Sequence, residues 1–269
     1  MSSNSKLKAY DRVELARHEK RPKVRDFIEF IIKEPMYFHG DRYFADDKSI
    51  LGGIGYIDNI PVTFIGTHKG KSLEENVACN FGMPRPEGYR KALRLMKQAE
   101  KFKRPIITFI DTPGAYPGIE AEERGQGEAI ARNIMEMSSL RVPIVSVFTG
   151  EGGSGGALAL SVANRIIMME NSIFSILSPE GFATILWKDA SRYKEATEVM
   201  KLTAKDLYDF KIIDKVIKED IAFTLDNFEK NFIRLKKEII KDLKVLMKKT
   251  SQELVSERQE KFSKIGGGF

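Results

Sequence analysis

Cysteine is nearly absent from this chain. Cys79 is its one cysteine among 269 residues, which excludes a disulfide framework and a Cys-x-x-Cys zinc site within the chain. No apolar run approaches the roughly 18 residues that a membrane-spanning helix needs. Residues 1–8 lack the apolar segment of a secretory signal. Together these absences favour a soluble, cytoplasmic protein that binds no metal of its own.

Histidine is also scarce, and its placement bears on catalysis. The pattern Gly152-x-Ser154-x-Gly156 matches the nucleophile elbow of serine hydrolases, in which a histidine follows the serine along the chain. All three histidines precede the serine, which disfavours a serine hydrolase; they are His18, His39 and His68. A phosphate-binding P-loop is excluded because no Gly-Lys-Ser/Thr follows the glycines.

Nucleic-acid-binding motifs are missing too, although the chain is basic. The formal net charge is +6 and the pI is about 9.1, a balance that suits anionic partners such as nucleotides, CoA or an acidic protein. A well-solvated, lysine-rich surface explains the same charge. No RNP-like aromatic pattern, helix-turn-helix signature or Cys/His finger occurs, so no specific nucleic-acid partner is predicted. With 42% hydrophobic residues, the chain can form one large α/β domain.

Glycine, by contrast, is concentrated in one short stretch. Five glycines lie between Gly150 and Gly156. The apolar run 142–148 before them predicts a buried strand, and the small residues 157–163 after them predict a tightly packed helix. A strand, a glycine turn and a helix together aim free backbone N–H groups at a negative charge. We therefore predict an anion or oxyanion site at this turn.

Two other interpretations of the glycine stretch are open at this point. Gly150-x-Gly152-x-x-Gly155 matches the dinucleotide-binding fingerprint, and Glu170 falls where a ribose-binding acid would stand. That fingerprint alone is a weak signal. Alternatively, the glycines serve only the close packing of a helix on a strand, although such packing explains one or two glycines rather than five.

A similar unit precedes the glycine stretch. A predicted strand at 106–110 leads into the loop 111–118, which holds two prolines and two glycines, and then into a helix over about 120–140. Strands that alternate with helices predict a mainly parallel sheet, in which both loops lie at the same edge. In this rigid loop Tyr116 is a candidate pocket residue. Asp111 is interpreted as a capping carboxylate rather than a catalytic base.

The remaining elements follow from periodicity and turn residues. Residues 1–20 are expected to be irregular or a short arm, and 265–269 to be loose. His68 and Lys69 are expected to face solvent or a ligand. The lysine-rich segment 223–249 predicts an amphipathic helix whose apolar face needs a partner surface in this chain or another subunit. We also predict helices at 24–32, 89–102, 188–200 and 203–210 and another beginning after Ser178, a hairpin of strands 50–57 and 61–66, and strands at 165–169, 173–176 and 212–217.

Longer blocks of sequence resemble one family, the α subunit of bacterial acetyl-CoA carboxylase carboxyltransferase. The resemblance runs from about residue 11 to residue 216. It implies an α/β, crotonase-like (ClpP/crotonase) spiral of ββα units with flanking helices. It also implies an N-terminal arm over 1–20, the carboxyltransferase domain over 21–220, and a C-terminal helical extension over 221–269 that packs in cis or on a partner. The matching blocks are 80–96, 105–118, 121–126, 150–158 and 178–181.

The resemblance also implies a reaction. Carboxyltransferases of this kind move a carboxyl group from carboxybiotin, delivered by a biotin carboxyl carrier protein, to acetyl-CoA to give malonyl-CoA, the first committed step of fatty acid biosynthesis. They work with a β subunit in an α2β2 assembly, and the zinc is expected in the β subunit only. An enoyl-CoA hydratase or isomerase on the same fold is the alternative, and it would need a well-placed pair of carboxylates.

Site residues are carried over from the resemblance. The N–H groups of Gly155 and Gly156 would form an oxyanion hole for carboxybiotin. The departing biotin can itself take the acetyl proton, so no catalytic acid or base is named. The chain departs from many relatives in a shorter N-terminus and in lacking a Gly- and His-containing stretch after the last strand, which bears on subunit contacts. The biotin pocket would be lined by Gly152, Gly153, Ala157, Pro113, Gly114, Ala115 and Tyr116.

Overall fold

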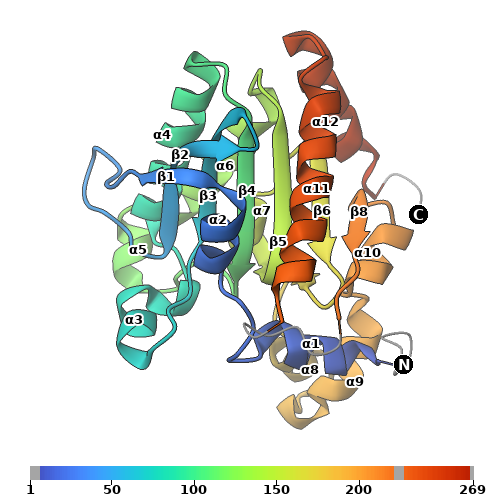
Figure 1. The fold of residues 1–269 in the computed structure, drawn as a ribbon. Coiled ribbons are helices and arrows are strands. Elements are labelled where there is room, and N and C mark those ends of the chain that lie inside the picture. The colour runs from blue at the N-terminus through green and yellow to red at the C-terminus, as the bar shows by residue number, and fades with distance from the viewer. Residues whose placement is uncertain (1–6, 221–226, 267–269) are drawn as a thin grey trace.

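An eight-stranded sheet organises the molecule (Figure 1). The structure is a computed structural model, and it describes residues 7–220 and 227–266. The strands follow the spatial order β1-β2-β3-β4-β5-β6-β8, and β7 pairs with β5 beside this path. Their bounds are β1 Lys33–Tyr37, β2 Ile50–Ile57, β3 Ile60–Thr67, β4 Ile106–Thr112, β5 Ile144–Gly153, β6 Arg165–Met169, β7 Ile173–Ser175 and β8 Lys215–Ile217.

Helices cover both faces of the sheet. Figure 1 shows α2 and α11 on the near face and α4 and α6 on the far face. The bounds are α1 Ala9–Arg17, α2 Val24–Ile31, α3 Leu73–Ala78, α4 Pro86–Lys101, α5 Ile119–Glu123, α6 Gln126–Ser139, α7 Ser154–Leu158, α8 Pro179–Trp187, α9 Tyr193–Met200, α10 Ala204–Asp209, α11 Glu229–Leu246 and α12 Ser251–Lys264, with short 3₁₀ turns η2 Asn80–Gly82 and η3 Ala190–Arg192.

The sequences of the central strands β4 and β5 are largely apolar because both faces of these strands are buried. Every residue of β4 and β5 is buried. Within β4, Ile107 and Phe109 belong to the core shared with α2 and α11, whereas Ile106 and Ile110 belong to the core shared with α4 and α6. This two-residue alternation under helices on both sides is typical of the parallel part of an α/β sheet.

The predicted hairpin and the predicted parallel sheet are confirmed. β2 and β3 pair antiparallel across a turn at Asp58, whose φ is +56°. From β3 onward the pairs β3–β4, β4–β5, β5–β6 and β6–β8 are all parallel. Strand β1 adds an antiparallel edge to β2. The architecture is therefore a mixed sheet whose parallel half carries the two glycine-bearing loops.

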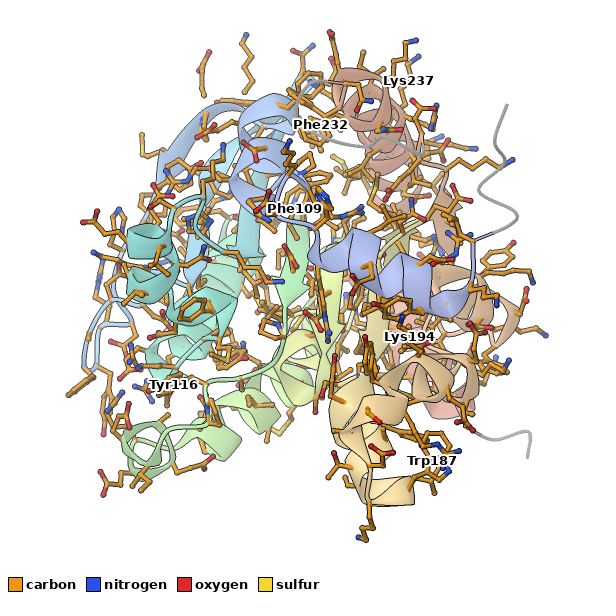
Figure 2. All side chains as sticks on the ribbon, turned by 90° about the horizontal axis from the view of Figure 1, so that it is seen from below. Phe109, Tyr116, Trp187, Lys194, Phe232 and Lys237 are labelled. Atoms are coloured by element: carbon orange, nitrogen blue, oxygen red, sulfur yellow. The ribbon has the colours of Figure 1, made fainter. Side chains whose placement is uncertain are left out.

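The apolar face of α11 packs within this chain. Phe232 is fully buried, and its ring centroid lies 4.4 Å from that of Phe27 on α2. Phe27 in turn lies 6.5 Å from Phe109 of β4. Figure 2 shows Phe109 and Phe232 in the interior, while Lys237 lies on the outer side of α11. Each fully buried side chain of this size contributes about 1.5–3 kcal/mol, so α11 is part of the core. Of the expected helix 223–249, residues 223–226 lie outside the described part.

Several elements differ from the sequence-based expectation. Residues 9–17 form a helix, α1, rather than an irregular arm. Strand β1 was not predicted, because Pro35 interrupts its pattern, and it lies at the sheet edge where proline is tolerated. The helix expected over about 120–140 is two helices, α5 and α6. Gly125, with φ +83°, breaks them apart in a left-handed conformation.

A further helix, α12, lies within the helical extension expected over 221–269, although its own bounds were not predicted. Its start carries a readable signal, since Thr250 and Glu253 form a capping box in which each side chain accepts the other residue's backbone N–H. Helix α12 is fixed by Arg258, which is fully buried. The Arg258 guanidinium donates to the carbonyl of Leu140 at 2.9 Å and to that of Val142 at 3.1 Å, just beyond α6. It also donates to the carbonyl of Met137 in the last turn of α6, where a helix leaves carbonyls unpaired.

Replacing Arg258 with methionine should lower the free energy of unfolding by at least about 3 kcal/mol. The apolar side chain fills the space but leaves two or more buried carbonyls without partners, each at a cost of about 1–3 kcal/mol. Urea unfolding of the purified chain measures the change. Arg132→Met, on the exposed side of α6, should shift the value by no more than about 0.5 kcal/mol. Equal stability of the Arg258 variant and wild type would contradict this account of α12.

Candidate functional site

The glycine stretch forms the junction between β5 and α7. Strand β5 continues as far as Gly153, and α7 begins at Ser154, whose φ of +49° lies in the left-handed region. The helix expected over 157–163 is wrong in its position, because α7 ends at Leu158. Beyond it the carbonyl of Leu160 accepts bonds from the buried hydroxyls of Thr108 and Ser146, at 2.7 and 3.1 Å. These side chains hold the backbone in a turn.

The glycine stretch and the loop after β4 lie in direct main-chain contact. A Cβ atom placed on Gly153 would lie 1.9 Å from the carbonyl oxygen of Pro113, and one on Gly156 would lie 2.5 Å from the backbone nitrogen of Ala115. Both positions therefore require glycine. Gly114, with φ +148°, needs the same freedom. The prediction that both loops share one edge of the sheet is confirmed.

Two backbone N–H groups at this contact have no acceptor. Gly155 and Gly156 lie in the first turn of α7, where a helix offers no acceptor to its own N–H groups. Among the described residues, no hydrogen bond uses either group as its donor. Gly155 is half-buried beside the exposed Ser154, so the turn can be reached from solvent. Gly156 itself is buried, so of the two N–H groups that of Gly155 lies nearer to solvent.

A buried ion pair lies directly beneath the glycines. The carboxylate of Asp111, 3% exposed, is bonded to the Lys69 ammonium at 2.7 Å. The same carboxylate oxygen accepts the backbone N–H of Glu151 at 3.0 Å, and a Cβ on Gly150 would lie 2.5 Å from it. Burial alone would raise the pKa of Asp111, but the Lys69 ammonium and these hydrogen bonds hold it below its usual value. Asp111 is therefore not the capping carboxylate that sequence analysis expected, but a buried ion-pair partner that also accepts a backbone N–H of β5.

Helix α1 closes the other side of this network. The Arg17 guanidinium bonds Glu151 at 2.7 Å and Glu180 at 2.9 Å, and Lys69 lies 3.8 Å from Glu151. The two carboxylates nearest the glycine turn, Asp111 and Glu151, are therefore both neutralised by cations. Neither is placed as a free carboxylate of the kind that an enoyl-CoA hydratase would use.

Tyr116 lies farther along the same loop. Its half-buried ring packs against the Arg85 guanidinium, 4.5 Å from the ring centroid. The buried amide of Gln126 donates to the carbonyls of Pro84 and Tyr116, at 2.8 and 2.9 Å. Figure 2 places Tyr116 on the side of the molecule away from α11. These contacts tie the start of α6 to the segment before α4 and hold the loop rigid.

The sequence matches the family described as acetyl co-enzyme A carboxylase carboxyltransferase-like over residues 2–266. The chain belongs to this family. It is 57% identical to the acetyl-coenzyme A carboxylase carboxyl transferase subunit alpha of Clostridium beijerinckii, over 97% of this chain and 96% of that one. It is 56% identical to the subunit of the same name from Clostridium botulinum, over 96% and 94% of the two chains.

A fused relative and two solved structures complete the comparison. In Clostridium tetani a chain named subunits beta/alpha is 54% identical over 97% of this chain, which spans 46% of that longer protein. A transcarboxylase 12S structure superposes with a TM-score of 0.70 at 17% identity, over 87% of this chain and 43% of that one. A Pseudomonas malonate decarboxylase hetero-tetramer superposes with a TM-score of 0.65 at 15% identity, over 78% of this chain and 84% of that one. The predicted carboxyltransferase fold class is confirmed.

Within this carboxyltransferase fold, the structure brings together most of the predicted site residues. Gly153 and Gly156 contact Pro113, Gly114 and Ala115. Gly152 pairs with Thr112 across β4 and β5, and Ala157 is buried in α7. Tyr116 follows directly after Ala115, and it contacts Arg85 and Gln126.

Sequence analysis missed the charged residues around the glycine turn. His68 is buried rather than facing solvent, and Lys69 bonds Asp111. The pairing of Lys69 with Asp111 could have been predicted from the sequence. Lys69 comes just after β3 and Asp111 lies near the end of the neighbouring parallel strand β4, so both lie at the same edge of the sheet. The partners Arg17 and Glu151, 134 residues apart, carry no local signal.

Over 7–220 and 227–266, no cluster of three or more His, Cys, Asp or Glu side chains is arranged to hold a metal ion. Over the same ranges, no helix has the length and apolar character needed to cross a membrane.

Asp111→Asn should lower the free energy of unfolding by about 3 kcal/mol, because it removes the nearer counterion of the buried Lys69 ammonium and leaves only Glu151, at 3.8 Å. Carboxyl transfer should fall about 10²-fold as the glycine turn shifts. The difference in free energy of unfolding between wild type and the variant should shrink as the pH falls below the usual aspartate pKa of about 3.9. A carboxylate whose pKa is lowered by folding stabilises the fold only while it is ionised.

Urea unfolding at several pH values and a steady-state transfer assay measure these effects. The matched control is Asp209→Asn, an exposed partner of Lys205 on α10, which should change neither quantity appreciably. An Asp111 variant with wild-type stability and activity would contradict the positioning role.

Proposed function

We propose that this chain is the α subunit of an acetyl-CoA carboxyltransferase. With a β subunit it transfers the carboxyl group of carboxybiotin to acetyl-CoA and yields malonyl-CoA, the first committed step of fatty acid biosynthesis. The observation that carries the proposal is an identity of 56% and 57% to two subunits of that name over nearly the full length of both chains. We also propose that the protein acts in the cytoplasm.

The glycine turn supplies a chemical role that suits this reaction. When carboxybiotin loses its carboxyl group, negative charge develops on the ureido oxygen of the biotin ring. The unbonded N–H groups of Gly155 and Gly156 stand at the edge of the sheet with no acceptor of their own. Preorganised donors of this kind stabilise a developing charge by about 3 kcal/mol each, because they need no reorientation during the reaction.

Proton transfer in the proposed mechanism needs no side chain of this chain. The two carboxylates nearest the turn, Asp111 and Glu151, are held by Lys69 and Arg17. The Lys69 ammonium holds the pKa of Asp111 below its usual value, so this carboxylate is a poor base, and the Glu151 carboxylate is bonded to the Arg17 guanidinium. The biotin that departs from the carboxyl group can take the acetyl proton, so we assign no acid or base here.

The proposed partners follow from the same reaction. The fused beta/alpha chain of Clostridium tetani supports a β subunit as the direct partner. Ile119 on α5 and Ile176 after β7, each 78% exposed, flank the segments that meet at the glycine turn, and apolar side chains so exposed suit a protein interface. We place the biotin carrier protein and acetyl-CoA at that interface, an α2β2 assembly around it, and zinc in the β subunit.

Co-expression with the β subunit of the same genome tests the proposal. The purified complex should catalyse malonyl-CoA-dependent carboxylation of biocytin, while either subunit alone should not. A well-formed complex without this activity would overturn the proposal. Turnover of an enoyl-CoA by this chain alone would favour the hydratase alternative.

Gly156→Val should reduce kcat for carboxyl transfer at least about 10²–10³-fold, because the new side chain displaces Ala115 and distorts the proposed oxyanion hole. The KM for acetyl-CoA and assembly with the β subunit should change little. Ser154→Ala should keep most of the activity, because the hydroxyl of this exposed residue has no role in the mechanism. An inactive Ser154 variant together with an active Gly156 variant would refute the oxyanion role.

A further inference from the structure

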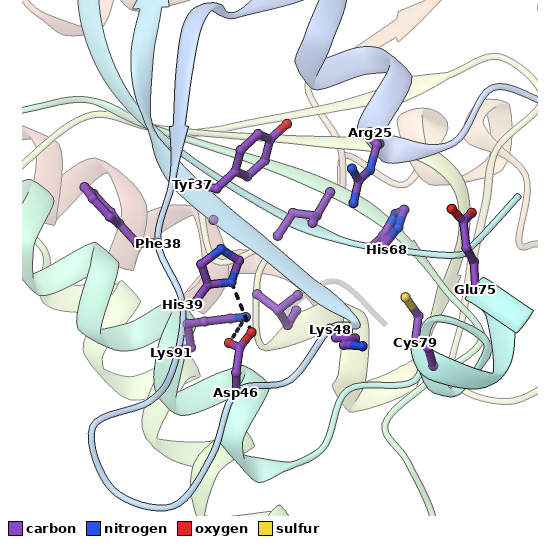
Figure 3. A pocket seen from close by; sticks show the side chains of 14 residues that line it. Arg25, Tyr37, Phe38, His39, Asp46, Lys48, His68, Glu75, Cys79 and Lys91 are labelled. Carbon is purple, nitrogen blue, oxygen red and sulfur yellow. Dashed lines mark hydrogen bonds and ion pairs between the residues drawn. The ribbon is translucent and has the colours of Figure 1, made fainter.

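A cavity opens between β1, β2, α3 and the end of β3, and we name it the His68 pocket. Figure 3 shows its lining side chains. The cavity volume is about 220 Å³, below the roughly 300–1,000 Å³ of pockets for drug-sized ligands. Phe38, Leu51 and Cys79 give it an apolar wall. It can therefore hold a small molecule of a few carbon atoms.

Two buried polar atoms in this lining have no partner. The Nδ1 atom of His68 and the hydroxyl of Tyr37 make no hydrogen bond in the described part of the chain. His68 is only 5% exposed. Burial lowers the pKa of His68 to about 4, so the ring is neutral at pH 7. A buried polar atom without a partner costs about 1–3 kcal/mol, and a bound molecule that bonded to both atoms would remove this cost.

The cations around the pocket are the third feature. Figure 3 shows Arg25 reaching from α2 toward the His68 ring. Within the described residues, neither Arg25 nor Lys48 has a recorded ion pair or hydrogen bond. Lys91 is held by Asp46 at 2.6 Å, and the other acid in the lining is Glu75, whose carboxylate accepts the backbone N–H of Lys71 at 2.8 Å. Two unpaired cations against one acid leave a net charge of one positive unit.

We propose that the His68 pocket binds a small organic monoanion, a carboxylate with a short apolar tail. The carboxylate lies between the Arg25 guanidinium and the hydroxyl of Tyr37, with the neutral imidazole of His68 donating to it. The tail lies on Phe38, Leu51 and Cys79. A single negative charge matches the net charge of the lining, whereas a phosphate dianion would meet repulsion from Glu75. An uncharged alcohol could not form a charge-assisted hydrogen bond with Arg25.

The position of the pocket connects it to the glycine turn. His68 is followed directly by Lys69, whose ammonium bonds Asp111 beneath Gly150. The occupant of the pocket would therefore contact the residue next to the buried ion pair. This inference concerns ligand binding alone and does not depend on the proposed carboxyl transfer.

Equilibrium dialysis of the full-length chain with radiolabelled butyrate tests the proposal. Butyrate should be retained saturably, with one molecule per chain. Arg25→Gln should weaken binding at least about tenfold, because a charge-assisted hydrogen bond is lost, and Tyr37→Phe should weaken it measurably. The matched control Arg132→Gln, on the exposed side of α6, should leave binding unchanged. Thermal unfolding would verify that each variant is folded.

Competition identifies the ligand class. Unlabelled hexanoate should displace butyrate, while inorganic phosphate and butan-1-ol at the same concentration should not. Absence of saturable binding, or equal binding by wild type and Arg25→Gln, would overturn the site. Displacement by phosphate would overturn the monocarboxylate assignment, and displacement by butan-1-ol would reduce the site to an apolar cavity.

Discussion

The contact between two main-chain loops at the ends of β4 and β5 is the constraint on which the rest of the site depends. Gly153 and Gly156 approach Pro113 and Ala115 so closely that no side chain fits between them. This approach fixes the direction of the first turn of α7 and leaves two N–H groups without acceptors. The sheet, its helices and the ion pairs around the turn keep that geometry rigid.

Charge neutralisation explains how polar groups can lie so deep beneath the turn. Asp111 is bonded by Lys69, and Glu151 by Arg17. Each cation comes from a different part of the chain, Lys69 from the end of β3 and Arg17 from α1. Breaking such a pair is costly because one buried charge remains. The arrangement therefore holds the backbone fixed and leaves neither carboxylate free, which suits the proposed role of the main-chain donors.

The features predicted from sequence are those with a local or periodic signal. The hairpin, the parallel strands and the two glycine loops follow from apolar runs bounded by turn residues, and the long matching blocks identified the family. What failed depends on tertiary contacts. Helix α1 has little apolar surface and is held by long-range bonds such as that of Arg12 with Asn171. The break between α5 and α6 depends on the left-handed backbone of the single residue Gly125. The turn after Leu158 depends on two hydroxyls from distant strands.

A structure of the αβ complex with a biotin ligand would test the central claim most directly. The account predicts the ureido oxygen of biotin about 2.7–3.1 Å from the backbone nitrogens of Gly155 and Gly156, with the contact of Gly156 and Ala115 retained. A ureido oxygen bonded to a side chain instead, or N–H groups of Gly155 and Gly156 that bond to the protein itself, would contradict it.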